Sequence, residues 1–160
     1  MNLGETLRNF QLGKVKLGPR WLNLEIDFKP DDQEAAWELY VEMLTRIVTQ
    51  PLPADAGDEK TALDSVYSLF PTTREILQRH GRKTIQFSAV AIPILNQIVR
   101  PFTAKWHKEV LAGAFDDVAK RSEFREELSA LQEDLRNYNR LLADIAGVED
   151  LTDLEGPAGT

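Results

Sequence analysis

A heptad-like repeat near the C-terminal end of this 160-residue chain constrains the fold more than any other feature. Apolar side chains recur at alternating steps of four and three residues over 124–145, which places them on one face of a single long helix. Such a face needs a partner that excludes water from it. Two partners fit: antiparallel helices of the same chain, or the same face of a second copy in a short coiled coil. The residues of the repeat are Phe124, Leu128, Leu131, Leu135, Tyr138, Leu142 and Ile145.

An earlier helix is predicted over about 31–48. Asp31 and Asp32 follow Pro30 and are typical of the residues that cap a helix start, so we interpret this acidic pair as a cap and not as a catalytic or metal site. Apolar residues then recur at helical spacing and predict one buried stripe. This stripe consists of Trp37, Tyr40, Val41, Leu44, Ile47 and Val48.

Two more helical segments are predicted between these, over 59–80 and 84–111, and Pro71 either kinks the first segment or begins a new helix within it. Gly81 follows the first and is suited to end it, because glycine readily adopts a positive φ. The second contains Pro93 and Pro101. Each proline removes one hydrogen bond from the helix backbone, so we expect this helix to be bent or broken.

The N-terminal part of the chain has a different pattern and predicts a β-hairpin over about 10–29. Leucine, isoleucine and phenylalanine alternate with polar residues over 22–28, the period expected of a half-buried strand. A first strand is predicted over 10–17, and Gly18 and Pro19 would form the turn. The apolar residues of the second strand are Leu22, Leu24, Ile26 and Phe28.

Together these elements predict a mainly α fold: a four- to five-helix bundle in one domain over 1–148, with the hairpin packed against it. Residues 149–160 are rich in acidic and small residues and are predicted to form a disordered tail. No apolar run reaches the roughly 20 residues that a membrane span needs. The chain has no cysteine, which agrees with a reducing compartment. We therefore expect a cytoplasmic protein.

The chain lacks the motifs that carry nucleotide, metal and hydrolytic chemistry. It contains neither a glycine-rich phosphate loop nor a spaced-glycine dinucleotide turn, and no strained turn presents a nucleophilic serine. His80 and His107 are the only histidines, and neither has a second ligand at metal-binding spacing. We predict no metal and no cofactor, and a non-enzymatic role is favoured.

The most suggestive cluster follows the uncharged apolar run of 87–99. Basic and aromatic residues gather there at the exit of the predicted bent helix, and residues 74–108 carry a local charge of +6 although the whole chain carries −7. A basic surface on an acidic protein suits an acidic protein partner or a phosphorylated ligand. We therefore predict ligand or partner binding at Arg100, Lys105, Trp106, His107 and Lys108.

Two short segments, RPFTAKWH and REILQRH, resemble the Arg-x4-6-His signature of the HEPN ribonucleases, compact helical proteins that cleave RNA as dimers. The resemblance implies that Arg100 would bind the scissile phosphate and His107 would transfer a proton. Arg74 and His80 would be the equivalent alternative pair. Guanidinium binds phosphate through two hydrogen bonds, and imidazole titrates near neutral pH.

A second resemblance covers about residues 37–145. The segments LFPTTREIL and ILNQIVRPFTAKWH look similar to small helical accessory proteins of bacterial conflict and antiphage systems. This resemblance implies an accessory, sensing or adaptor role beside an effector protein, and it carries over no catalytic residue.

The favoured function is therefore a non-enzymatic interaction or assembly module, an adaptor subunit of a bacterial multi-protein system that binds a partner protein or further copies of itself. Two alternatives stay open. One is metal-independent RNA cleavage by Arg100 and His107. The other is binding of a nucleotide or single-stranded nucleic acid through Arg100, Lys105 and Trp106.

Overall fold

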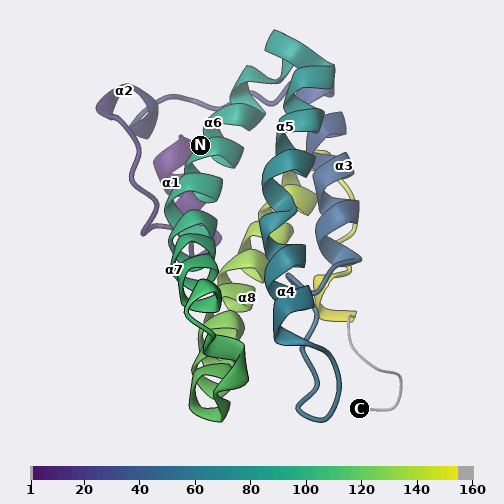
Figure 1. Cartoon of the computed structure of the whole chain (residues 1–160). Helices are drawn as coiled ribbons and strands as arrows, with labels where there is room; N and C mark the ends of the chain where they lie inside the picture. Colours follow the sequence, from purple (N-terminus) through teal and green to yellow (C-terminus); the bar gives the residue numbers. More distant parts are fainter. Residues whose placement is uncertain (1, 155–160) are drawn as a thin grey trace.

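The computed structural model describes residues 2–154, and it confirms that the chain is mainly α-helical (Figure 1). Within these residues, no helix is both long enough and apolar enough to cross a membrane. The longer helices lie side by side. They are α3 (Pro30–Leu44), α4 (Glu59–Tyr67), α5 (Leu69–His80), α6 (Ile85–Ile94), α7 (Arg100–Leu111) and α8 (Val118–Ala146), and the short helices α1 (Leu3–Asn9) and α2 (Pro19–Leu22) precede them.

The predicted bend over 84–111 is confirmed, and the helix does not break there. α6 continues into α7 through a π-helical turn over Leu95–Val99. Pro93 lies inside α6 and Pro101 at the start of α7. Both prolines lack a backbone N–H, and the wider π turn between them lets the helix continue past the lost hydrogen bonds.

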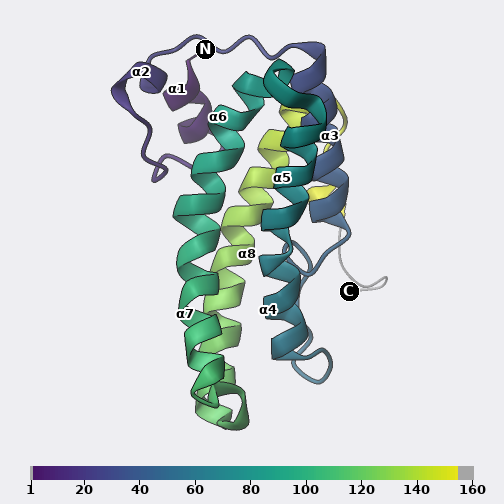
Figure 2. The same ribbon diagram turned by 45° about the horizontal axis from the view of Figure 1, so that its top comes forward.

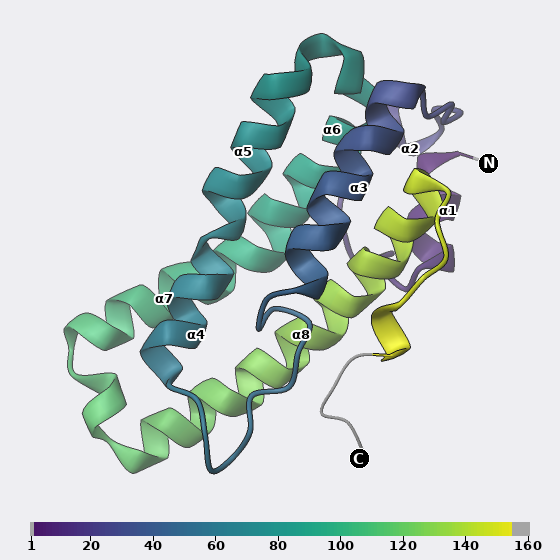
Figure 3. The same cartoon turned by 90° about the vertical axis from the view of Figure 1, so that its right-hand side faces the viewer.

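α8 buries the whole predicted repeat within its own chain. Every residue of the repeat is buried, and α8 runs beside α3 in the opposite direction (Figure 3). The side chain of Asp117 caps the start of α8 by accepting a 2.9 Å hydrogen bond from the N–H of Ala119. Gly147 ends the helix with a φ of 71°. Of the two predicted partners, the chain's own helices therefore cover this face.

The buried stripe of α3 is rotated around the helix from the predicted position. Trp37 and Val41 are exposed, whereas Leu39 and Met43 are fully buried. The buried arc is therefore centred on positions 36, 39, 40 and 43, and residues 37 and 41 lie at its edge, one turn apart. Helical spacing shows which residues share a side of a helix, but it does not show how far neighbouring helices wrap around that side.

The predicted hairpin over 10–29 is wrong, because no strand forms within residues 2–154. Gly18 and Pro19 do not form the turn; Pro19 begins α2, a position that its fixed φ suits. The alternation beyond α2 is nevertheless real, since Leu24, Ile26 and Phe28 are half-buried and the residues between them are exposed. The segment is extended and packs on helices.

The hydrogen bonds that a paired strand would have made with this backbone are supplied by other groups. The N–H of Leu3 donates to the carbonyl of Leu24 at 3.1 Å. The side-chain amide of Gln97 binds both the N–H and the carbonyl of Lys16, each at 2.7 Å. The N-terminal segment is thereby fastened beside α6, on the side away from α5 and α3 (Figure 2).

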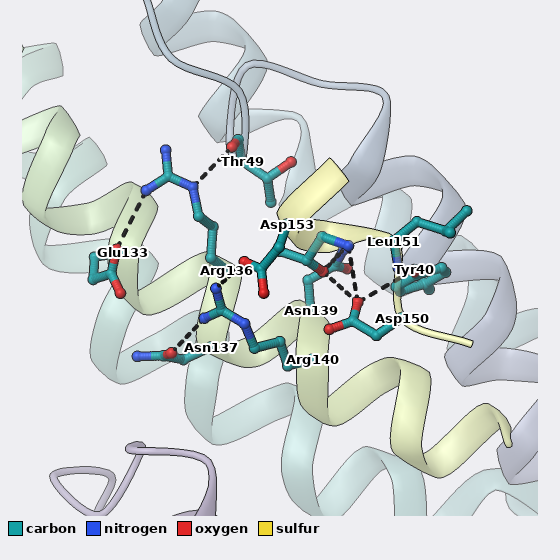
Figure 4. Close-up of polar contacts among 11 residues, drawn as sticks. Tyr40, Thr49, Glu133, Arg136, Asn137, Asn139, Arg140, Asp150, Leu151 and Asp153 are labelled. Atoms are coloured by element: carbon teal, nitrogen blue, oxygen red, sulfur yellow. Dashed lines mark hydrogen bonds and ion pairs between the residues drawn. The ribbon is translucent and has the colours of Figure 1, made fainter. Parts of the chain in front are cut away.

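Part of the segment predicted as a disordered acidic tail is held against the bundle (Figure 4). The hydroxyl of Tyr40 donates to the carboxylate of Asp150 at 3.3 Å, and Arg140 forms a 2.6 Å ion pair with Asp153. These contacts join the end of the described chain to α3 and α8. The remainder of the predicted tail, 155–160, lies outside the described residues.

Candidate functional site

The predicted basic and aromatic cluster on α7 does not form one surface. Lys105 and Trp106 turn toward α8, where the indole Nε1–H of Trp106 donates to Glu127 at 2.9 Å. Lys105 forms ion pairs with Glu127 and with Glu123, the latter at 2.9 Å. Hydrogen bonds to these two carboxylates raise the pKa of Lys105. Trp106 is completely buried, so no partner reaches it in this structure.

Arg100 and His107 lie on another side of α7 and face the joint between α4 and α5, as their spacing of seven residues predicts. The guanidinium of Arg100 lies 4.6 Å from the ring centroid of Phe70. The ring of His107 meets Tyr67 edge-on, with the centroids 5.0 Å apart. Lys108 is exposed and has no ion pair among the described residues. Four of the five predicted residues are therefore reachable, since only Trp106 is buried. Lys105 is exposed but pairs with Glu123 and Glu127, so it and Trp106 stabilise the contact between α7 and α8.

The second Arg and His pair is also separated. Arg74 is exposed on α5, whereas His80 binds Glu38 of α3 through Nε2 at 2.8 Å. The Nδ1 atom of His80 lies 3.9 Å from the carboxylate of Asp31, and Arg79 also pairs with Glu38. These contacts join the C-terminal end of α5 to α3, which is a structural role.

Replacing Glu38 with glutamine is expected to destabilise the protein by about 1 kcal/mol near neutral pH and by less in acid. Burial would raise the pKa of Glu38, but hydrogen bonds from His80 and Arg79 outweigh it and lower this pKa below its ordinary value of 4.5. A carboxyl with a lowered pKa stabilises the fold above the unfolded-state pKa, and the contribution is lost as the pH falls through the folded-state pKa.

Urea denaturation of the wild type and Glu38→Gln checks this prediction. The difference between their free energies of unfolding should shrink from about pH 6 to about pH 3. A difference that grows as the pH falls would contradict it.

An apolar groove lies between α6 and the segment that leads into α2. Its volume is about 260 Å³. On the α6 side, Ile85 is 56% exposed and Ile92 is 46% exposed. We call this hollow the α2–α6 groove; its apolar lining consists of Leu17, Trp21, Ile85, Ala89, Ile92 and Pro93.

The groove exists because α6 is apolar on both of its faces. No charged residue occurs from Ile85 to Val99. The inner face buries Phe87, Val90, Ala91 and Ile94 in the core, and the outer face presents Ile85, Ala89 and Ile92. A helix that is apolar all round is normally covered on all sides. Here the N-terminal segment covers the outer face only in part.

The cations around the groove differ from most others in the protein. Eleven of the 19 Lys and Arg residues form ion pairs with Asp or Glu within residues 2–154. Of those without such a pair in this part of the chain, Lys16 lines the groove, Arg20 precedes Trp21, and Arg82 and Lys83 lie just before Ile85. The groove is therefore a mainly apolar surface with one cation without an ion pair in its lining, and three more such cations lie within a few residues of the lining in the sequence.

Sequence reasoning did not identify this site. The apolar run of 87–99 predicts a core helix, and the predicted binding residues are the basic and aromatic ones that follow it. The available signal was the lack of any charged residue on α6, combined with Arg82 and Lys83 just before it. A solvent-facing helix normally carries charged and polar residues on its outer side, so the absence of charge marks a face that meets another apolar surface.

Within residues 2–154, no three histidine, aspartate or glutamate side chains come together as a candidate metal site. No protein-family model, curated protein or solved structure matches this chain. The functional assignment therefore depends on the geometry and chemistry of the α2–α6 groove.

Proposed function

We propose that this protein is a non-enzymatic interaction module that holds an apolar, acidic segment of a protein in the α2–α6 groove. The observation that carries the proposal is the outer face of α6, where Ile85 and Ile92 are exposed on a helix that has no charged residue. Single exposed apolar residues are common on protein surfaces, but a group of them in a groove is typical of a binding site.

The charge around the groove specifies the partner's chemistry. Lys16, Arg20, Arg82 and Lys83 have no ion pair among the described residues, so acidic side chains of a bound segment can pair with them. The chain as a whole is acidic, with a net charge of −7, yet charges farther away than about 8–10 Å are largely screened by salt. The local cations therefore decide which segments bind.

An adaptor role in a bacterial multi-protein system, including an antiphage system, agrees with such a groove. This role follows from the resemblance of residues 37–145 to small accessory proteins, and it stays a prediction.

RNA cleavage by Arg100 and His107 also stays a prediction. Incubation with labelled RNA in the absence of metal, beside Arg100→Ala and His107→Ala, tests it. Nucleic-acid binding by Arg100, Lys105 and Trp106 also stays a prediction. The burial of Trp106 removes the ring surface on which a base would stack.

Labelling of single cysteines tests the proposed groove. The chain has no cysteine, so Ile92→Cys and Val118→Cys each carry one unique thiol. Val118 is 71% exposed at the start of α8 and serves as the matched control. A membrane-permeant maleimide should label position 92 more slowly in the source cells than in dilute purified protein. The slowing is roughly tenfold where the partner is present at about ten times its dissociation constant.

Position 118 should be labelled at the same rate in both settings, relative to a free thiol standard. If position 92 also reacts equally fast in cells and in dilute solution, no partner occupies the groove and the proposed function is wrong.

A further inference from the structure

A second apolar surface lies at the end of the described chain, and it is acidic. Leu154 is 76% exposed, and Val148 and Leu151 are also exposed at steps of three residues. Glu149, Asp150 and Asp153 alternate with them in the sequence. We call residues 148–154 the C-terminal acidic segment. Its combination of apolar and acidic side chains is the chemistry that the α2–α6 groove would bind.

This segment is held in place before any partner arrives. Asp150 accepts hydrogen bonds from the N–H and the hydroxyl of Thr152 at 3.0 and 2.6 Å. The N–H of Leu151 donates to the hydroxyl of Tyr40 at 2.6 Å. Figure 4 shows these contacts against α3 and α8. A segment that is already ordered loses little conformational entropy on binding.

The two surfaces lie on opposite sides of one molecule. In Figures 1 and 2, α2 and α6 are on the left, and the C-terminal acidic segment is on the right beyond α3. A chain therefore cannot place this segment in its own groove. Two copies can, and since each copy would use a different surface, the contact is head-to-tail.

Resting on the proposed function, we propose that the groove of one copy binds the C-terminal acidic segment of a second copy, so that the protein assembles head-to-tail. Leu151 and Leu154 would lie against Ile85 and Ile92, and Glu149 would approach Lys83 or its neighbouring cations. Glu149 has no ion pair among the described residues, so its pairing breaks no existing contact.

The shape of the site favours a protein segment over a membrane or a nucleic acid. The groove is concave and closed on one side by the 16–21 segment, whereas a membrane receives apolar side chains that protrude. A nucleic acid would bring many phosphates close to a protein of net charge −7. Two exposed leucines on an acidic segment suit the apolar lining of the groove and the cations near it.

Paired variants of the full chain test the assembly by light scattering. The groove variant is Ile85→Gln with Ile92→Gln, and the segment variant is Leu151→Gln with Leu154→Gln. Leu111→Gln with Val118→Gln is the matched control, because these exposed apolar residues lie at the end of α7 and the start of α8, away from both surfaces (Figure 3). None of the substitutions changes the net charge, and circular dichroism checks that each variant is folded.

The wild type and the control should gain mass as the protein concentration rises, and should lose it at high salt. The groove variant alone and the segment variant alone should each associate at least about tenfold more weakly. Each apolar side chain that is buried at the contact contributes about a factor of ten to the binding constant. An equimolar mixture of the groove and segment variants should form a dimer with one copy of each, because each retains the surface that the other lacks.

A wild type that stays monomeric at every concentration, or a mixture that stays monomeric where the wild type assembles, would overturn the inference. The inference would also be overturned if the wild type stayed monomeric and sedimented with phosphatidylserine vesicles while the groove variant did not, because the groove would then bind a membrane. A monomeric wild type whose position 92 is still protected in cells refutes head-to-tail assembly and leaves the proposed function intact. An unprotected position 92 refutes the proposed function itself.

Discussion

Replacing Trp106 with alanine is expected to lower the free energy of unfolding by about 3–5 kcal/mol. The indole is fully buried. It stacks on Phe115 with ring centroids 6.0 Å apart and meets Phe124 edge-on at 5.1 Å. Its Nε1–H also donates to Glu127. Alanine would leave a cavity between α7 and α8 that the surrounding helices fill only in part, and Glu127 would lose a partner.

Urea denaturation followed by circular dichroism measures this loss without depending on tryptophan fluorescence. Trp106→Phe is the matched control, because it keeps most of the ring packing and removes the hydrogen bond. It should cost about 1–2 kcal/mol. An alanine variant that loses less than about 1 kcal/mol would behave like a surface substitution. That result would contradict the burial of Trp106 and would favour the ligand-binding role that the sequence predicts for it.

Asp32→Ala is expected to cost about 2–4 kcal/mol, which is large for a residue at a helix start. Asp32 is fully buried. One carboxylate oxygen accepts the N–H of Lys29 at 2.9 Å, and the other accepts the N–H of Phe87 at 2.9 Å. Phe87 lies in the first turn of α6, where backbone N–H groups have no partner within the helix. One carboxylate therefore serves the starts of α3 and α6 together.

Asp32→Asn is the matched control for the two hydrogen bonds that this carboxylate accepts. Asparagine has the shape of aspartate and keeps one acceptor oxygen, so this variant should lose less stability than Asp32→Ala. Asp31→Ala is a second control, since the neighbouring acid is only half-buried and should cost less than about 1 kcal/mol. Equal losses at positions 31 and 32 would contradict a special role for the buried carboxylate of Asp32.

The helices could be predicted from the sequence because their signals are local. The repeat on α8 needs only its own spacing, and the bend between α6 and α7 follows from Pro93 and Pro101. The hairpin could not be judged in the same way. Alternation over 22–28 identifies the inward-facing residues, but pairing requires a second strand. Here the side chain of Gln97, 81 residues from Lys16, binds the backbone of Lys16 in the predicted first strand, and the N–H of Leu3 binds the carbonyl of Leu24 in the second.

The candidate site was harder to predict for a related physical reason. A cluster in the sequence becomes a cluster in space only when its residues share one side of a helix. Lys105 and Trp106 face α8, while Arg100 and His107 face the joint of α4 and α5, so the predicted site divides. The α2–α6 groove combines α6 with a segment about 70 residues earlier in the chain, and no local pattern places the two together.

Photo-cross-linking from position 92 tests the role of the α2–α6 groove most directly. A photoreactive phenylalanine analogue replaces Ile92 in one variant and Val118 in the control, and both are irradiated in the source cells. We predict that position 92 yields one reproducible cross-linked protein, identified by mass spectrometry as a second copy of this chain or as another protein. Position 118 should not yield it. The same products from both positions, or none from position 92, would contradict the assignment of the groove as a binding site.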